Sequence, residues 1–409
     1  MDQEKKSIEE TRIQLSAPSL GPSYVPVEPN ISALYFEDER SRLFKRVWLQ
    51  VGRVEAIPNP GNYFVSQLEV LGASVFVTRG RDGVLRAFHN LCRHRGNRLV
   101  KQAEGSAKAF SCGFHGWTYN SEGALVTIPL EREFRGCDKA ELGLIPLALD
   151  VWEGFIFVHL NIEPEESLRD YLRPVAGLLD GFPFVEMELS GWWSARLASN
   201  WKTFQDAFIE AYHVLAVHRR SIPDFRLDPI VPSAQPLGRH CKLTYYQNMH
   251  HEPKPAEALA FKLGSSAFLN IDNTNDLKTR QWPSLNFERR DNWVFDEFVI
   301  FPNFHLFLGD GWMLCHEFWP VTVDHTDWHV KYYQQRTTSP AVRIAQEYSK
   351  VAMRDAIRED LSTIENTHAA QRSGVMPFMT LSSSLESLIV HHHGVVADYV
   401  GTRPTRVEP

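Results

Sequence analysis

The stretch CRHRGNRLVKQAEGSAKAFSCGFHGWTY, residues 92–119, decides how the first half of the chain folds. It holds two Cys–His pairs, Cys92 with His94 and Cys112 with His115, with 17 residues between the pairs. Two such pairs on two short loops supply the four ligands of a metal centre, because thiolates and imidazoles together bind zinc or a 2Fe–2S cluster. Cys2His2 zinc sites usually place both cysteines first. Here each loop contributes one Cys and one His, which favours a cluster with two irons.

Short runs of β-forming residues lie on both sides of this stretch. Examples are VWLQVGRV (47–54), NYFVSQLEV (62–70) and GFIFVHL (154–160), with turn residues between them. The pattern predicts a small all-β domain. From about residue 165 onward the pattern is mixed, with four strands expected near 241–248, 295–308, 312–319 and 327–335. Antiparallel strands followed by a long C-terminal helix predict an α+β fold.

A second group of candidate ligands lies on a helix predicted over residues 199–218. Glu210 and His213 are three residues apart and share one face of a helix. His213 and His218 are five apart, which places them about 140° from each other on an ideal helix. Both can bind one metal only if this helix distorts or ends between them.

A third ligand is expected on the long helix predicted over residues 340–372. Asp360 lies three residues after Ile357 and four before Ile364, so it falls on the apolar face of that helix. A buried carboxylate needs a partner, and two histidines with one carboxylate form the usual ferrous site of oxygenases. Asp355 and Glu359 lie off this face among arginines and are expected to be solvated.

Both groups of residues resemble one family. The pattern C-x-H-x17-C-x2-H followed by Gly-Trp-x-Tyr resembles the Rieske 2Fe–2S domain of ring-hydroxylating oxygenase α-subunits. Asn-Trp-Lys opening a helix that ends in Tyr-His-x4-His, with a downstream Glu-Asp-x4-Glu, is similar to their catalytic domain. The resemblance implies that Cys92, His94, Cys112 and His115 hold the Rieske cluster. It further implies that His213, His218 and Asp360 hold mononuclear Fe(II).

The resemblance also implies a domain organisation and an assembly. A Rieske domain at 46–160 is inserted into a larger catalytic domain of the helix-grip type, made of 161–409 together with an N-terminal arm and helix at 1–45. A head-to-tail homotrimer is expected, in which Glu210 carries electrons from His115 of one subunit to His213 of the next. Asp206 is expected to lie behind the iron ligands and to support them without binding the iron itself.

Glu210 departs from the arene dihydroxylases, which usually carry Asp at that position. It is more similar to the homotrimeric monooxygenase branch, which includes enzymes acting on carnitine or choline. The expected activity is therefore hydroxylation or oxidative demethylation of a small organic molecule, with O2 and electrons from NAD(P)H. Arene cis-dihydroxylation and oxygenation of a quaternary amine stay as alternatives. Two alternatives come from other classes of protein: a Rieske electron-transfer protein without oxygenase activity and an interaction protein stabilised by zinc.

The substrate pocket is the least determined part. Candidate lining residues come from the iron helix and from the stretch 301–307: Phe208, Leu215, Phe301, Asn303, His305 and Phe307. If they line a pocket, an apolar or aromatic substrate is favoured. Trp282, Trp293 or Phe301 would instead serve an aromatic cage for a quaternary ammonium group.

Composition excludes several classes of function. Lys and Arg number 43 and Asp and Glu 50, so the net charge is −7, which argues against nucleic-acid or anionic-membrane binding. Five cysteines give no disulfide framework, and no signal peptide or transmembrane stretch is apparent, so a cytoplasmic location is expected. No nucleotide-binding motif is present. We therefore expect no tightly bound nucleotide or flavin, and a separate reductase, with or without a ferredoxin, as electron donor.

Overall fold

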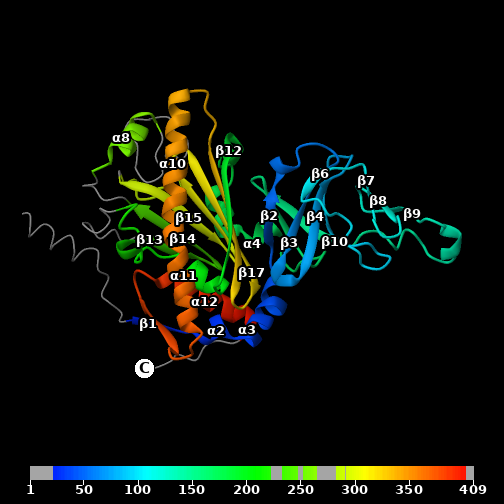
Figure 1. Ribbon diagram of the computed structural model, residues 1–409, viewed down its shortest axis with the longest axis horizontal. Coiled ribbons are helices and arrows are strands. Elements are labelled where there is room, and N and C mark those ends of the chain that lie inside the picture. Colours follow the sequence, from blue (N-terminus) through cyan, green and yellow to red (C-terminus); the bar gives the residue numbers. More distant parts are fainter. Residues whose placement is uncertain (1–21, 223–232, 247–251, 265–281, 291, 402–409) are drawn as a thin grey trace, which may run out of the picture. The chain divides into compact units, whose positions relative to one another are not determined.

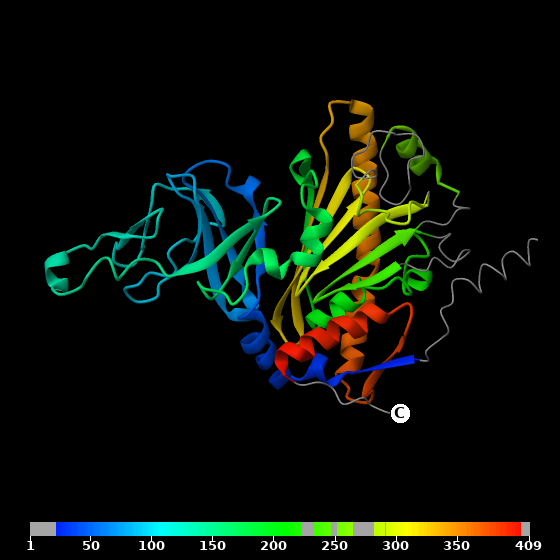
Figure 2. The same cartoon turned by 180° about the vertical axis from the view of Figure 1, so that it is seen from behind.

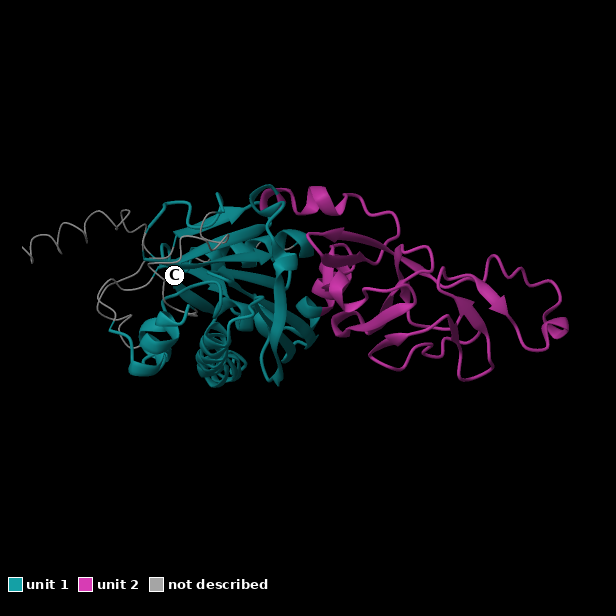
Figure 3. Ribbon diagram, turned by 90° about the horizontal axis from the view of Figure 1, so that it is seen from above, with its two compact units in different colours: residues 1–36, 177–409 teal, residues 37–176 magenta. Residues whose placement is uncertain are grey.

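The computed structural model describes residues 22–222, 233–246, 252–264, 282–290 and 292–401. The chain divides into two compact units, a smaller one of residues 37–176 and a larger one of residues 1–36 and 177–409 (Figure 3). The first 21 residues of the predicted N-terminal arm lie outside the described residues.

The smaller unit is built from β-strands, as predicted. Seven strands form one sheet in the order β2-β11-β10-β5-β4-β3-β6, and three form a second sheet in the order β7-β8-β9 (Figure 1). Their bounds are β2 (Leu49–Arg53), β3 (Asn62–Leu68), β4 (Ala73–Arg79), β5 (Leu85–His89), β6 (Glu104–Ser106), β7 (Ala109–Ser111), β8 (Thr118–Asn120), β9 (Leu125–Thr127), β10 (Pro146–Trp152) and β11 (Phe155–His159).

The smaller unit extends beyond residues 46–160 at both ends. The π-helical segment η1 (Glu39–Phe44) contacts the short helix η3 (Glu69–Leu71), and α4 (Leu168–Tyr171) contacts β10. These contacts group 37–45 and 161–176 with the β-strands. The helix expected within residues 1–45 is divided among α2 (Glu28–Ile31), α3 (Ala33–Asp38) and η1.

The larger unit contains one seven-stranded antiparallel sheet in the order β12-β18-β17-β16-β15-β14-β13. Its strands are β12 (Met187–Leu197), β13 (Ser233–Leu237), β14 (His240–Tyr246), β15 (Trp293–Ile300), β16 (Phe304–Gly309), β17 (Trp312–Thr322) and β18 (His325–Gln335). A two-stranded sheet pairs β1 (Pro22–Pro26) with β19 (Phe378–Ser382). The α+β class is confirmed.

Helices complete the larger unit (Figure 2). They are α5 (Arg173–Leu179), which begins in the smaller unit, α6 (Trp201–Asp206), α7 (Val214–Val217), α8 (Pro255–Lys262), α10 (Pro340–Glu359), α11 (Leu361–Gln371) and α12 (Ser387–Val400). Two of the predicted helices are interrupted. The first ends at Asp206 and resumes at Val214, and the second breaks at Asp360.

One side of the larger sheet packs against α6, α10 and α11. The core there joins apolar residues of β17 and β18 to both helical regions, and its members are Leu197, Phe204, Phe208, Phe307, Trp312, Leu314, Phe318, Trp328, Val330, Tyr332, Met353, Ile357 and Ile364. We call this the helix-facing side of the sheet. Within the described residues, no helix combines the length and apolar character needed to cross a bilayer.

Candidate metal centres

The two Cys–His loops of the smaller unit repeat one backbone pattern. In loop 92–97 and in loop 112–117 the Cys N–H donates to the carbonyl of the residue five further on, at 2.9 and 2.8 Å. The glycine four residues after each Cys donates back to the Cys carbonyl, at 2.9 Å in both loops. Gly96 and Gly116 adopt φ values of 76° and 72°, which glycine tolerates without a Cβ penalty. The two loops therefore share one backbone turn, while the histidine follows the cysteine by two residues in the first and by three in the second.

The four predicted ligands lie as two neighbouring pairs. The rings of His94 and His115 lie with their centroids 4.6 Å apart at an interplanar angle of 72°. The thiols of Cys92 and Cys112 are neighbours, because each shifts the pKa of the other. Two sulfurs and two imidazoles from two equivalent loops are the donor set that a 2Fe–2S cluster with histidines on one iron requires.

Hydrogen-bond donors surround both sulfurs. The Tyr119 hydroxyl lies 3.4 Å from Cys92 Sγ, and Asn97 Nδ2 lies 3.5 Å from Cys112 Sγ. Burial raises the pKa of Cys92, against the opposing effect of Tyr119. Burial also acts to raise the pKa of Cys112, but the Phe114 N–H and the Asn97 amide outweigh it and lower that pKa. Donors to sulfur stabilise the thiolate and tune the potential of an iron–sulfur cluster.

The imidazoles differ in exposure. His94 stacks on Trp117 with centroids 5.0 Å apart, and its Nδ1 atom is buried without a hydrogen-bond partner among the described residues. A buried ring nitrogen without a protein partner suits a metal ligand. His115 is exposed beside the exposed ring of Phe114. This edge of the smaller unit is therefore open to solvent.

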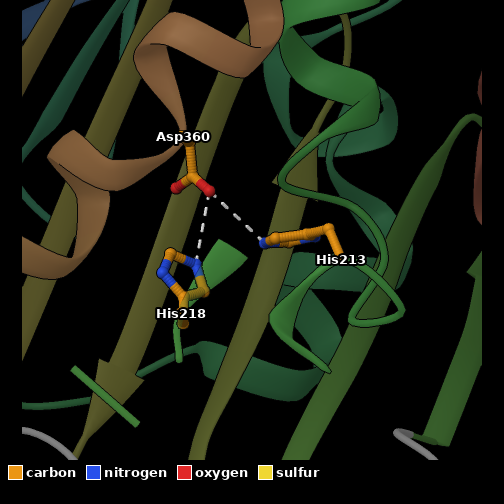
Figure 4. A group of neighbouring side chains, drawn as sticks. All are labelled: His213, His218 and Asp360. Atoms are coloured by element: carbon orange, nitrogen blue, oxygen red, sulfur yellow. Dashed lines mark ion pairs between the residues drawn. The ribbon is translucent and has the colours of Figure 1, made fainter. Parts of the chain in front are cut away.

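The larger unit brings His213, His218 and Asp360 together (Figure 4). One ligand atom from each lies within 4.8 Å of the others. His213 Nε2 is 3.6 Å, and His218 Nε2 3.3 Å, from Asp360 Oδ1. The interruptions of the helices permit this arrangement. His213 and His218 occupy the two ends of the short helix α7, and Asp360 lies at the junction of α10 and α11.

Each histidine is held through its second nitrogen by a glutamate. His213 Nδ1 lies 2.5 Å from Glu210 Oε1, and His218 Nδ1 lies 2.9 Å from Glu359 Oε2. A carboxylate on Nδ1 fixes the tautomer and leaves Nε2 free to bind a metal. Both Nε2 atoms face Asp360 in this way. The donor set, two imidazoles and one buried carboxylate, fits mononuclear Fe(II).

The prediction for Glu359 was wrong. Instead of being a solvated charge, it accepts hydrogen bonds from His218 and from the Ser221 hydroxyl at 2.7 Å. Glu359 is the last residue of α10, and its partners come from the segment 218–221, which the periodicity of its own helix could not indicate. Burial lowers the pKa of His218, but Asp360 and Glu359 outweigh it and raise that pKa overall.

Hydrogen bonds also order the segment between α6 and α7. The backbone N–H groups of Tyr212 and His213 donate to Glu210 Oε2. The Tyr245 hydroxyl lies 3.3 Å from the Phe208 carbonyl and 3.4 Å from the Glu210 carbonyl. Asp206, predicted to support the iron, bonds instead through both carboxylate oxygens to His393 Nε2 at 3.1 Å.

The predicted pocket residues separate into groups. Phe208 and Phe307 are in the core on the helix-facing side, and His305 is fully buried on the same side. Leu215 packs against Ala211 and Val214 beside the metal ligands. Phe301 stacks on Tyr399 of α12 with centroids 5.5 Å apart, and Asn303 is buried with its carbonyl accepting from Phe318 N–H.

The tryptophans considered for an aromatic cage have other partners. The indole N–H of Trp282 donates to the Leu178 carbonyl at 3.0 Å, and that of Trp293 donates to Asp296 at 3.0 Å. Their indole N–H groups are thus fixed by the protein.

Comparison with known families decides between a zinc site and a 2Fe–2S cluster at the two Cys–His loops. It also identifies the family of the larger unit. The model of the Rieske [2Fe-2S] domain matches residues 47–145, and that of the ring hydroxylating alpha subunit (catalytic domain) matches residues 184–402, more than half of the chain. The chain belongs to the ring-hydroxylating α-subunit family. Its two domains imply a Rieske cluster and a non-haem iron. The family thereby confirms the resemblance inferred from the two motifs.

Curated relatives of this ring-hydroxylating α-subunit include two kinds of oxygenase. The carnitine monooxygenase oxygenase subunit of Escherichia coli (strain K12) is 33% identical over 187 residues, which cover 45% of this chain and 49% of the relative. The large oxygenase component of the naphthalene 1,2-dioxygenase system of Pseudomonas aeruginosa is 36% identical over 196 residues, which cover 46% and 42%. The chain therefore spans about half the length of the curated relatives that it matches.

Solved structures share the fold over nearly the full length. A quaternary ammonium Rieske monooxygenase described for carnitine oxidation and inter-subunit electron transfer superposes with a TM-score of 0.74 at 20% identity, covering 93% of this chain and 96% of that one. Naphthalene 1,2-dioxygenase from Rhodococcus sp. bound to indole gives 0.73 at 18% identity, covering 97% of each. At these identities the likeness concerns the fold of the ring-hydroxylating α-subunit alone.

Proposed function

We propose that this protein is the terminal oxygenase of a multicomponent Rieske system. The observation that carries the proposal is the presence in one chain of two complete donor sets, Cys92, His94, Cys112 and His115 in one unit and His213, His218 and Asp360 in the other. A Rieske electron-transfer protein would need only the first set. Three converging ligands, each histidine braced by a glutamate, would have no use in it.

When bound, the cluster and the iron supply one-electron storage and activation of O2 next to the substrate. The residues of the chain position these groups and control access to them. Glu210 and Glu359 hold the imidazole Nε2 atoms toward Asp360. The backbone N–H groups of Tyr212 and His213 donate to Glu210 Oε2, which keeps the other carboxylate oxygen on His213 Nδ1.

We infer that electrons reach the iron site between subunits. His115 is exposed, while Glu210 braces His213 in the other unit, so an exposed imidazole and a carboxylate are available as two sides of a junction. A head-to-tail homotrimer would place His115 of one subunit at Glu210 of the next, since a closed ring uses one such interface repeatedly. A separate reductase, directly or through a ferredoxin, would supply the electrons from NAD(P)H.

The proposed reaction is hydroxylation or oxidative demethylation of a small, apolar or aromatic organic molecule. Glu210 in place of Asp supports the monooxygenase branch. Arene cis-dihydroxylation is the second candidate, supported by the naphthalene dioxygenase relatives. Oxygenation of a quaternary amine is the third, supported by the carnitine monooxygenase relatives.

We also propose a Rieske domain over about residues 46–160 with the flanking segments completing the catalytic domain, no tightly bound nucleotide or flavin, and a cytoplasmic location. None of the five cysteines forms a disulfide, which supports a reducing compartment.

The test is a reconstitution with a surrogate reductase and a panel of aromatic, methoxylated and quaternary ammonium compounds. Coupled O2 consumption is recorded with the product mass, which distinguishes addition of one oxygen atom, addition of two hydroxyl groups and loss of a methyl group. Substrate-coupled O2 uptake is the expected result. A protein whose iron content is only that of the cluster, and which never consumes O2 with any compound, would be an electron carrier.

A further inference from the structure

The helix-facing side of the larger sheet is uncharged. Strand register places the following residues of β14 to β18 on it: Cys241, Leu243, Tyr245, Phe295, Glu297, Val299, His305, Phe307, Gly309, Trp312, Leu314, His316, Phe318, Trp328, Val330 and Tyr332. They include no Lys or Arg and one carboxylate. Charged pairs lie on the other side, for example Lys242 with Asp296 at 3.1 Å and Lys331 with Glu317 at 2.7 Å.

The one carboxylate belongs to a neutral hydrogen-bonded chain. Burial raises the pKa of Glu297 well above its usual range and lowers the pKa of His305 well below its own. Tyr245 donates to Glu297 at 3.1 Å, Glu297 lies 2.8 Å from His305 Nδ1, and His305 Nε2 lies 2.8 Å from Gln205 Oε1. Because Gln205 Oε1 only accepts, His305 carries its proton on Nε2, and protonated Glu297 donates to Nδ1. The polar atoms of Tyr245, Glu297 and His305 therefore satisfy one another, whereas Gln205 Nε2 has no partner among the described residues.

The ring of His316, unlike that of His305, is not part of a hydrogen-bonded chain in the part of the protein that the structure describes. Its side chain is fully buried directly opposite His305 in the register of β16 and β17, and neither ring nitrogen has a hydrogen-bond partner among the described residues. Its neighbours are aromatic carbon: the centroids of Phe307, Phe208, Trp328 and Phe318 lie 4.9, 5.1, 5.4 and 5.8 Å from that of His316. Burial in these surroundings lowers the pKa of His316 to about 3, so the ring is neutral, with one donor and one acceptor nitrogen.

The four aromatic residues around His316 adjoin the elements that carry the metal ligands. Phe208 lies five residues before His213, and Ile357 and Ile364, which precede and follow Asp360, belong to the same core as Phe208. The indole N–H of Trp328, on the same side, also has no partner among the described residues. Buried polar groups in proteins are almost always hydrogen-bonded, and unsatisfied ones near a site point to a ligand.

We propose that His316 is a specificity-determining residue, whose ring nitrogens hydrogen-bond the polar group of an uncharged, mainly aromatic substrate held between Phe208 and Phe307. The inference rests on the proposed oxygenase function. Small-molecule sites combine apolar walls with a few placed polar groups, and His316 is the polar group here. A carboxylate-bearing zwitterion would need a cation, which the residues of this side do not offer.

The probes are indole and indene, bicyclic molecules of the same shape, of which indole alone carries an N–H donor. Dissociation constants are measured by calorimetry with the iron- and cluster-loaded protein. Wild type should bind indole about fivefold more tightly than indene, the effect of one net hydrogen bond. His316→Phe, which keeps an aromatic ring but removes both nitrogens, should make the two constants equal. His316→Gln, which restores a donor and an acceptor, should recover part of the preference.

The matched control is His392→Phe. His392 is also buried, but it belongs to α12 and packs against Trp201 and Phe301. This variant should keep the wild-type preference for indole. The proposal is overturned if wild type binds neither probe, if His316→Phe keeps the preference, or if L-carnitine binds more tightly than indole. Because binding is measured without turnover, a His316-dependent preference in a protein that never consumes O2 would reject the oxygenase function alone.

Discussion

Glu210 is the residue on which electron delivery to the iron site depends in the proposed function. Its carboxylate touches His213 through one oxygen and two backbone N–H groups through the other. Glu210→Gln keeps the size and removes the charge. We expect the visible spectrum of the cluster to be unchanged and turnover to fall by about 100-fold, in the upper range for partners of metal ligands. Single-turnover measurement of cluster oxidation checks this.

The control for Glu210 is Asp355→Asn, which removes an exposed carboxylate of α10 paired with Arg354. That variant should turn over normally. Wild-type rates in Glu210→Gln would show that this carboxylate is not part of the electron path.

Asp360 and Glu359 should differ in how strongly they affect the mononuclear iron. Asp360→Ala removes one of three ligands, so the iron of this site should be lost while that of the cluster is kept. Glu359→Gln leaves all ligands in place but weakens the support of His218, for which an affinity loss of about 10- to 100-fold is expected. Iron analysis and competition with a chelator measure both effects. Equal iron content in Asp360→Ala and wild type would contradict the assignment.

At the scale of elements, the ligands of the larger unit lie where helices end. The spacing of five between His213 and His218 cannot serve one metal on a regular helix, so a distortion or helix end was expected between them. The structure instead ends α6 before both histidines and places them at the two ends of the short helix α7. No glycine or proline lies near Asp360, and the apolar stripe runs through it, so the sequence carried no signal for the end of α10 at this point. Glu359 was missed because its partners, His218 and Ser221, come from a distant segment of the chain.

Strand register explains what else the sequence could not provide. Gln205, Tyr245 and Glu297 are far apart in the chain, and His305 follows Glu297 on the next strand. Their hydrogen-bonded chain exists only because β14, β15 and β16 pair in one register under α6. His305 was named from its place in an aromatic strand. The unpartnered state of His316 is likewise invisible in a linear sequence, since it depends on four neighbours from four segments.

The stability difference between Glu297→Gln and wild type should depend on pH. The folded-state pKa of Glu297 is raised above its ordinary value of 4.5, so its contribution to stability is complete below that value and is lost as pH rises toward the folded pKa. Glutamine makes the same bonds to Tyr245 and His305 at every pH. The free energy of unfolding of the variant should therefore rise relative to that of wild type by up to about 1.4 kcal/mol for each pH unit above pH 4.5.

Urea denaturation at pH 5, 6 and 7 measures this difference. Glu317→Gln, on the other side of the sheet and paired with Lys331, is the control and should not show the gain. A free-energy difference that stays constant with pH would mean that Glu297 is ionised in the folded protein.

At the scale of the whole molecule, the two motifs identified both domains because metal ligands must occur at fixed spacings in a chain. The proposed ring of subunits can be tested by mixing. His115→Ala should lack electron transfer out of the cluster, and Asp360→Ala should lack the iron. Each alone should be inactive. If electrons pass between subunits, assemblies refolded or co-expressed from both variants should regain a measurable fraction of wild-type turnover.

Co-expression of His115→Ala with Glu210→Gln serves as a second pair and should be complemented in the same way, because each defect lies on a different side of the junction. Assemblies that stay inactive in both mixtures would indicate that the path from His115 to Glu210 does not cross between subunits.

The closeness of Cys92 and Cys112 makes the order of maturation important. Before iron and sulfide arrive, dissolved oxygen that reaches these two neighbouring buried thiols can accept two electrons and two protons from them, forming hydrogen peroxide and joining the sulfurs as a disulfide. That bond would occupy both sulfur ligands at once. Metal-free protein kept in air should lose two hydrogens in mass and resist cluster loading until dithiothreitol is added, whereas Cys92→Ser should show no such intramolecular change. Cluster insertion in the cell therefore competes with oxidation of Cys92 and Cys112. The O2 that the finished enzyme is proposed to use can inactivate the metal-free protein.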